Sequence, residues 1–335
     1  MTYMVDASRI FMRFLKGFRK TAVFAITTRC NCRCMMCDMY KKPPRSISFE
    51  DARKVLDFLY ENKFLIVYFT GGEPTLHPDV IDIVKYANDL GFVTAMTTNG
   101  TVSKDTLVKL KEAGLYLLSV SFDHWEPEIC EKIRRHKGIK DKQERTIRLC
   151  KEIGLRTHTL TFLNSYVLRD GVERLIEYVN EKLGVPFGFC YPVKTNSSFY
   201  SLGQNLSEEE VSYRNLEKTL RTILKLKKEG KAIANLTTYI EDIIRFHENK
   251  PPNFYCKGGE GVFYVDWEGN VYPCFVKDKL FNILKGEKPR FLKNVKCNDC
   301  FTNCFREPSI LTQGSLNLSL LKEIFHSYKT KGLFL

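Results

Sequence analysis

The sequence is organised around residues 30–37, which read CNCRCMMC and directly follow the apolar run AVFAI at residues 22–26. Four thiols within eight residues, placed after an expected strand, are typical of metal ligands. Soft sulfur ligands select iron–sulfur clusters or zinc, and the Cys30-x3-Cys34-x2-Cys37 spacing lets three thiolates of one loop hold one iron–sulfur cube. Three ligands on a four-iron cluster leave one iron open to a substrate or cofactor. Spacing alone also permits sets that include Cys32, either Cys30/Cys32/Cys37 or a four-thiolate zinc site.

A second motif, Gly71-Gly72-Glu73-Pro74, follows the next apolar run. Its glycines let the backbone approach a ligand closely, and Glu73 or a neighbouring carbonyl can receive an ammonium group. Together with the cysteine loop, this motif resembles the radical S-adenosylmethionine (radical SAM) superfamily. The resemblance implies that Cys30, Cys34 and Cys37 are the catalytic ligands of a 4Fe-4S cluster whose open iron chelates SAM. It also implies one-electron cleavage of SAM to a 5′-deoxyadenosyl radical that abstracts hydrogen from a substrate.

Apolar runs alternate with amphipathic segments from residue 22 to about residue 190. We expect strands at residues 22–28, 64–69, 92–97, 116–121, 155–162 and 186–190, and helices at residues 49–62, 79–90, 103–113, 142–153 and 170–182. Six strands joined by helical crossovers imply parallel pairing. The expected fold class is therefore α/β, an open partial (β/α)6 barrel, as the resemblance also implies, with a C-terminal cysteine-rich extension.

Polar side chains stand at the expected carboxyl ends of these strands, where such sheets collect their chemistry. From these positions and from the resemblance, the candidate SAM-binding residues are Met36, Gly71, Gly72, Glu73, Pro74, Thr97, Asn99, Ser121, Asp123, Thr161 and Tyr191. Asn99-Gly100 is alternatively a simple turn, and Tyr191 is alternatively a substrate contact. Alternation along the fifth strand places Thr159 and Thr161 on one face, and we expect that face to line the cavity, with His158 in the helix layer.

A second cysteine group consists of Cys256, Cys274, Cys297, Cys300 and Cys304. Residues 262–272 between the first two are typical of a hairpin, which would bring Cys256 and Cys274 to one end. The pattern resembles the twitch and SPASM extensions of radical SAM enzymes, although it has fewer cysteines than a full SPASM extension. The resemblance implies one auxiliary 4Fe-4S cluster, and we predict that its ligands are the first four cysteines, with Cys304 as the alternative ligand. A zinc ribbon is the competing interpretation.

The remaining chain divides by composition. Residues 1–20 form an expected basic amphipathic helix, residues 21–195 the barrel, residues 196–250 a linker and helical segment, and residues 251–335 the extension. The first helix, with Ile10, Phe11 and Phe14 on its apolar side, has two interpretations: it binds an anionic membrane surface or a lipid-like substrate, or it docks across the open end of the barrel. We slightly favour docking.

Composition limits the class of protein. In 335 residues, no apolar run reaches the ~18–20 residues that span a bilayer, and no signal peptide is recognisable, so we expect a cytoplasmic protein. Eight of the 12 cysteines fall in the two groups when Cys32 is not counted, as expected in a reducing compartment. The net charge of +13 is scattered along the chain, which makes nucleic-acid binding a minor hypothesis.

The leading functional hypothesis is a radical SAM enzyme whose auxiliary cluster carries electrons or shapes the substrate domain. The basic helix and an aromatic content of 13% favour a small apolar, anionic or membrane-associated substrate, with peripheral membrane contact. The family resemblance implies an external one-electron donor of the ferredoxin or flavodoxin type. The alternatives are a radical SAM dehydrogenase acting on a peptide or small molecule, and a non-catalytic zinc-stabilised or nucleic-acid-binding protein.

Overall fold

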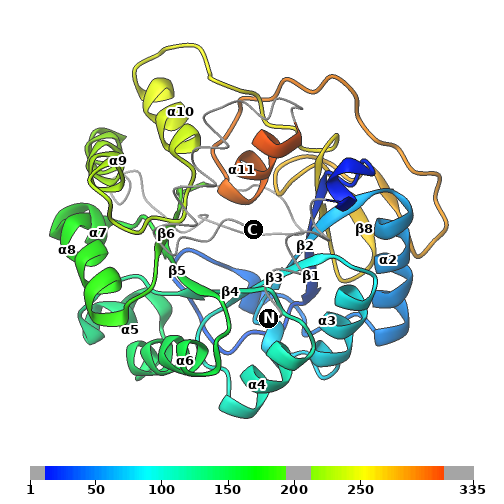
Figure 1. Ribbon diagram of the computed structural model, residues 1–335, viewed down its shortest axis with the longest axis horizontal. Coiled ribbons are helices and arrows are strands. Elements are labelled where there is room, and N and C mark those ends of the chain that lie inside the picture. The colour runs from blue at the N-terminus through cyan, green and yellow to red at the C-terminus, as the bar shows by residue number, and fades with distance from the viewer. Residues whose placement is uncertain (1–11, 194–212, 313–335) are drawn as a thin grey trace.

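The computed structural model describes residues 12–193 and 213–312, and within them one sheet organises the fold. Its strand order is β6-β5-β4-β3-β2-β1-β7-β8-β9. Neighbours from β1 to β6 are parallel, so the predicted partial barrel of six parallel strands is confirmed. Figure 1 shows the helices between these strands arranged around the outside of the curved sheet.

The strands are β1 (Lys20–Thr27), β2 (Phe64–Gly71), β3 (Val93–Thr98), β4 (Leu117–Ser121), β5 (Thr157–Phe162), β6 (Phe187–Cys190), β7 (Val262–Val265), β8 (Asn270–Tyr272) and β9 (Phe281–Asn282). The α-helices are α2 (Phe49–Glu61), α3 (Val80–Asp89), α4 (Lys104–Glu112), α5 (Pro127–Arg134), α6 (Ile139–Ile153), α7 (Ser165–Asp170), α8 (Val172–Glu177), α9 (Tyr213–Lys228), α10 (Thr237–His247) and α11 (Asn303–Thr312). Short 3-10 helices lie at Met39–Lys41 and Pro74–Leu76, and a π-helical turn at Tyr178–Leu183 continues α8.

Local signals explain most of these boundaries. Ser48 caps α2 by accepting a hydrogen bond from the Asp51 amide (3.1 Å), and Gly154 ends α6 with a left-handed backbone. The sequence analysis missed α5 and α7, which are only 8 and 6 residues long. Pro127 at the start of α5 is a typical first-turn residue and was the available signal.

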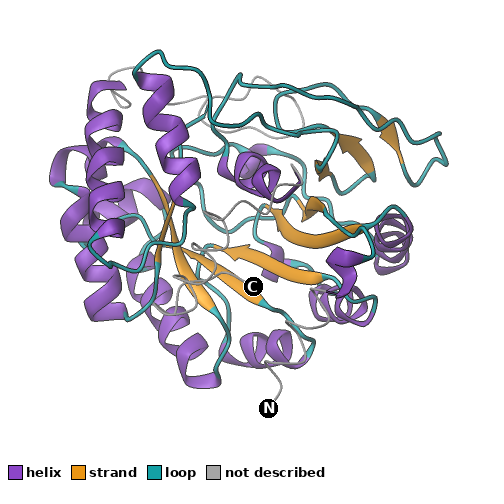
Figure 2. Ribbon diagram, turned by 45° about the horizontal axis from the view of Figure 1, so that its top comes forward, coloured by secondary structure: helices purple, strands orange, loops and turns teal. Residues whose placement is uncertain are grey.

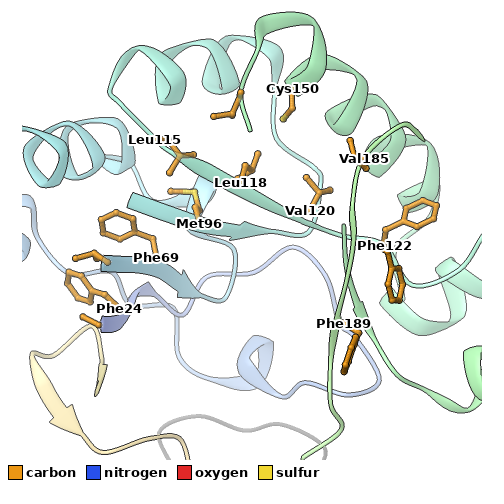
Figure 3. Close-up of a cluster of buried hydrophobic side chains, with 14 of the residues drawn as sticks. Phe24, Phe69, Met96, Leu115, Leu118, Val120, Phe122, Cys150, Val185 and Phe189 are labelled. Atoms are coloured by element: carbon orange, nitrogen blue, oxygen red, sulfur yellow. The ribbon is translucent and has the colours of Figure 1, made fainter. Parts of the chain in front are cut away.

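The main core lies between the sheet and the helices that cover it. Successive strand residues point to opposite faces, so Phe24, Phe69, Met96 and Leu118 face the helices (Figure 3). The other face of the parallel strands is turned to the barrel interior. Both faces are therefore covered, which is why these strands read as nearly continuous apolar runs.

The amino-terminal segment packs under the barrel. Ile10 and Phe11 lie outside the described residues, but residues 12–15 are helical, and Phe14 contacts a cluster of Phe18, Leu65 and Val93. Leu65 and Val93 lie at the amino ends of β2 and β3. The described residues of this segment therefore pack against the sheet, and residues 1–11 of the expected helix lie outside the described part of the chain. No helix in the described ranges combines the length and apolarity needed to cross a bilayer.

The C-terminal extension continues the same sheet. Strand β7 pairs in parallel with β1, and the predicted hairpin is confirmed by the antiparallel pairing of Tyr264 with Tyr272. Figure 1 shows α11 inside the ring of helices, and Figure 2 gives a second view of the same arrangement. Arg306 of α11 is buried, and its Nε donates to Asp242 of α10 (2.8 Å). The same guanidinium also donates to Asn298, so it fastens three segments together.

We predict that Arg306→Met lowers the free energy of unfolding by about 3–5 kcal/mol, because it leaves the Asp242 carboxylate buried without its partner. The matched control is Arg221→Met, which removes an exposed ion pair with Glu217 and should cost less than about 1 kcal/mol. Urea unfolding followed by far-UV circular dichroism measures both. Equal losses in the two variants would contradict the fastening role of the buried pair.

Candidate active site

One cavity of about 430 Å³ occupies the barrel interior. Its wall includes the first cysteine group and Gly71, Gly72 and Glu73 at the carboxyl ends of the strands. It extends down to Val93 near the amino end of β3, and α11 closes part of its upper side through Cys304. The strand order therefore brings both predicted motifs to one cavity.

The cysteine loop follows β1 and is held by α5. The backbone amides of Arg33 and Met35 donate to the Arg134 carbonyl (3.2 Å) and the Ile133 carbonyl (2.9 Å) at the end of that helix. Cys32 is buried among apolar side chains of α5 such as Ile133, with Cys34 and Met36 beside it. The loop is thus fixed by a helix that the sequence analysis did not predict.

The thiols of this loop differ in their electrostatic surroundings. A hydrogen bond with the Cys32 thiol lowers the pKa of Cys34 to about 6, and the Arg134 guanidinium, whose Nη1 lies 3.7 Å from the Cys34 sulfur, acts in the same direction. Burial raises the pKa of Cys30 to about 11 and that of Cys37 to about 12. Cys34 is therefore the most easily ionised of the three predicted ligands, and a bound cation would be needed to ionise Cys30 and Cys37 at neutral pH.

Glu73 joins the second motif to the third strand. Its carboxylate is buried and accepts hydrogen bonds from the hydroxyls of Thr75 (2.6 Å) and Thr98 (2.9 Å) and from the Asn99 amide (2.6 Å). Burial raises the pKa of Glu73 despite these donors. The hydrogen bonds fix the carboxylate, because a buried charge without partners is strongly unfavourable.

Asn99 continues this network to the cysteine loop. Its Nδ2 donates to Asn31 Oδ1 (2.7 Å), and Asn31 Nδ2 donates to the Thr101 hydroxyl (2.9 Å). Three loops that follow β1, β2 and β3 are therefore tied together by side-chain hydrogen bonds. Asn99 does more than form a turn, although its Oδ1 also accepts from the Thr101 amide as an Asx turn does.

Most predicted SAM contacts reach the cavity, but three do not. The predicted residues on its wall are Cys30, Cys34, Cys37, Met36, Gly71, Gly72, Glu73, Thr97, Asn99, Ser121 and Tyr191. Pro74 is buried in its turn. Asp123 is not part of the wall, and its carboxylate accepts hydrogen bonds from Arg134 Nε (2.5 Å) and from the Phe162 backbone amide (3.1 Å). Thr161 lies on the opposite face of β5 and donates to the Phe122 carbonyl (2.6 Å).

The prediction of which face of β5 lines the cavity was wrong. His158, Leu160 and Phe162 line the cavity, whereas Thr159 and Thr161 face away from it. Alternation predicted correctly that His158 and the threonines lie on opposite faces, but both faces are buried and the pattern cannot say which is inside. The sequence analysis also missed Tyr68 and Arg134, which line the cavity without any motif to mark them.

The second cysteine group gathers beside β7. The Cys256 amide donates to the Cys297 carbonyl (2.9 Å), and both cysteines, with Cys274, contact a cluster that includes Tyr264 and Phe305. Cys37 of the first group packs against the same cluster. Cys304 also contacts it but lies on the cavity wall, unlike the other four cysteines of its group.

The comparisons with known proteins agree with this geometry. The radical SAM superfamily model matches residues 24–179. Residues 24–179 form a radical SAM domain. The Fe-coproporphyrin III synthase of Methanosarcina barkeri is 28% identical over 223 residues, which are 65% of this chain and 55% of that protein. The PqqA peptide cyclase of Bradyrhizobium diazoefficiens is 23% identical over 274 residues, 79% of this chain and 68% of that protein.

The fold of this chain, including its radical SAM domain, is similar to that of a solved structure. Streptococcus suis SuiB bound to S-adenosylmethionine superposes with a TM-score of 0.63 at 16% identity, covering 81% of this chain and 64% of SuiB. At this identity the likeness concerns the fold alone. The chain spans about half the length of the first relative.

The radical SAM domain offers a donor set that fits an iron–sulfur cluster: three thiols of one loop lie on the wall of a cavity that Gly71 and Gly72 also line. Among the described residues, no three Cys, His, Asp or Glu side chains are grouped to hold a single metal ion. A cube of iron and sulfide separates its ligands by the width of the cube. The fit to a cluster therefore rests on the chemistry of the donors, since thiolates are the ligands that iron–sulfur clusters take.

We predict that Glu73→Gln lowers the free energy of unfolding by about 1–3 kcal/mol, because the amide places an N–H where the carboxylate accepted a hydrogen bond. Since the pKa of Glu73 is raised in the folded state, the carboxyl contributes stability at low pH and loses that contribution as pH rises through its folded pKa. The difference between wild type and variant should therefore shrink as pH increases.

Urea unfolding between acid and neutral pH measures this difference. The control is Glu112→Gln on the exposed end of α4, which should leave stability unchanged at every pH. A difference for Glu73→Gln that grows with pH would contradict the direction of the pKa shift.

Proposed function

We propose that this protein is a radical SAM enzyme that reductively cleaves S-adenosylmethionine and abstracts hydrogen from a substrate held in the barrel cavity. The observation that carries the proposal is the shared cavity, whose wall contains Cys30, Cys34 and Cys37 as well as Gly71 and Gly72. When bound, the 4Fe-4S cluster supplies the electron that breaks the S–C5′ bond of SAM and so yields the 5′-deoxyadenosyl radical.

The residues of the chain prepare the site for this chemistry. Cys30, Cys34 and Cys37 hold the cluster, and the Arg134 guanidinium favours the thiolate form of Cys34. The backbone around Gly71 and Gly72 receives the amino group of SAM, because its position beside the cysteine loop is fixed by the hydrogen bonds of Glu73. Ser121 at the end of β4 has its side chain on the same wall and contacts the ribose.

The finer proposal concerns the substrate. Apolar side chains such as Val23, Ile66 and Leu160 make up much of the cavity wall, which supports a mainly apolar small molecule, including a lipid-like or peripherally membrane-associated one. A peptide is the second candidate substrate, since one relative is named for its action on a peptide. An external ferredoxin or flavodoxin would supply the electron.

The second cysteine group would hold an auxiliary 4Fe-4S cluster on Cys256, Cys274, Cys297 and Cys300. These four thiols lie off the cavity, whereas Cys304 lies on its wall. A cluster with four thiolate ligands has no iron open to substrate, so it would carry electrons or support the substrate domain. If it accepts an electron from the substrate radical, the overall reaction is a two-electron oxidation, which makes the enzyme an oxidoreductase.

We predict that Cys34→Ala abolishes 5′-deoxyadenosine formation by the anaerobically reconstituted, dithionite-reduced protein. The reason is that a cluster ligand is lost beside the SAM-binding wall. Cys256→Ala, which affects only the second group, should retain part of this cleavage. Liquid chromatography of the quenched reaction measures 5′-deoxyadenosine, and normal production by Cys34→Ala would refute the ligand assignment.

We predict that Cys304→Ser keeps about eight irons per chain, whereas Cys300→Ser keeps about four, because only the second change removes a ligand of a four-iron cluster. Iron, sulfide and zinc analysis of the reconstituted variants measures this. A loss of iron in Cys304→Ser with retention in Cys300→Ser would reverse the assignment, and zinc in place of iron would support the structural-zinc alternative.

A further inference from the structure

A row of polar residues crosses the barrel interior on four neighbouring strands. Thr97 of β3 pairs in register with Ser119 of β4, and Ser119 pairs with His158 of β5. Opposite residues of neighbouring strands point to the same face, so all three are directed to the barrel interior. Tyr68 of β2 joins them through its hydroxyl. We call Tyr68, Thr97, Ser119 and His158 the polar belt.

The hydrogen bonds within the polar belt engage hydroxyl protons and leave hydroxyl oxygens that can still accept a hydrogen bond. The Thr97 hydroxyl donates to the Tyr68 hydroxyl (2.8 Å), which in turn donates to Ser119 Oγ (2.8 Å). Each of these hydroxyl oxygens has two lone pairs, so Thr97 and Tyr68, which line the cavity, keep free acceptor capacity while their protons are engaged. The belt is therefore prepared to receive an N–H or O–H group.

His158 is the unsatisfied member of the belt. Its side chain lines the cavity at 9% exposure, and its Nδ1 is buried without a hydrogen-bond partner among the described residues. Burial lowers the pKa of His158 to about 4, so the ring is neutral at physiological pH and has one donor and one acceptor nitrogen. Because Nδ1 has no accessible surface, a ligand in the cavity reaches the ring through its other nitrogen, Nε2, which can donate or accept a hydrogen bond according to the tautomer.

The backbone of the neighbouring strand β6 lies close to the His158 imidazole. A Cβ atom at Gly188 of β6 would lie 2.9 Å from His158 Cδ2, so only glycine leaves the imidazole its present position. The side chain thus occupies a specific place on the wall.

The surroundings of the belt are uncharged. Among the described residues, the carboxylate and guanidinium groups on the cavity wall are those of Glu73, Arg134 and Glu307, and each has a partner elsewhere. Glu73 lies in the turn that follows β2, Arg134 is the last residue of α5, and Glu307 is on α11. The strand residues around the belt, such as Ile66, Ala95 and Leu117, are apolar. A charged group at this depth would lose its hydration without gaining an opposite charge.

We propose that the polar belt is the substrate-anchoring subsite, and that it binds the hydroxyl group of an uncharged, otherwise apolar molecule. This inference rests on the proposed function, because it orients the substrate from the barrel wall toward the first cysteine group across the same cavity. The belt residues touch the substrate and not the cluster, so they determine which molecule is held.

The test uses the reconstituted holoenzyme with SAM and three probes of equal chain length: 1-octanol, octanoate and octylamine. Isothermal titration calorimetry under argon measures their affinities. We expect 1-octanol to bind at least tenfold more tightly than the two charged probes. His158→Leu and Tyr68→Phe should each weaken 1-octanol binding roughly threefold to tenfold, as the loss of one hydrogen bond does.

Matched controls are His136→Leu and Tyr86→Phe, which change the same residue types outside the cavity and should leave binding unchanged. Thr97→Val, a nearly isosteric change, provides an independent belt variant should either of the others fail to fold. Equal affinity for the charged probes, or unchanged 1-octanol binding in all belt variants, would overturn the subsite.

Production of 5′-deoxyadenosine without any probe is measured in parallel. If the wild-type protein produced no 5′-deoxyadenosine, the proposed function would be refuted, and the calorimetric affinities would still test the subsite. Its presence together with indiscriminate probe binding would refute only the subsite.

Discussion

The buried carboxylate of Glu73 is the constraint on which the site depends. A charged group with 1% exposure is tolerated only where donors surround it, and here they come from its own turn and from the end of β3. Because Asn99 also bonds to Asn31, the same network reaches the cysteine loop. The loops that would hold the cluster and SAM are therefore positioned by each other and by a rigid sheet, as a preorganised site requires.

One face of the sheet packs against the helices and the other lines the cavity, and this follows from the alternation of side chains along a strand. Phe24 and Phe69 face the helices (Figure 3). Their neighbours Val23 and Tyr68 line the cavity on the other face. The helices can therefore pack tightly on one face while the other keeps a cavity. Core packing and the lining of the cavity therefore fall to alternate residues of the same strands.

Sequence reasoning was most successful where the signal is local. The cysteine spacing, the Gly71–Pro74 turn and the alternation of strands and helices each depend on neighbours in the chain, and the two motifs and the six parallel strands occur as predicted. Long-range pairings left no such signal. Asp123 was expected to face SAM, but it pairs with Arg134 on a helix that the pattern did not reveal. The inward face of β5 was also misassigned, because relative alternation does not fix which of two buried faces is inside.

The parallel pairing of β7 with β1 has a consequence for the integrity of the barrel. Strand β1 leads into the cysteine loop and lies between β2 and β7, so its backbone is bonded on both sides. Cutting the chain before the extension would expose a long, apolar edge, and such edges recruit other chains and aggregate. The two cysteine-bearing parts are thus one folding unit in practice: the extension shields the strand from which the first cysteine loop emerges.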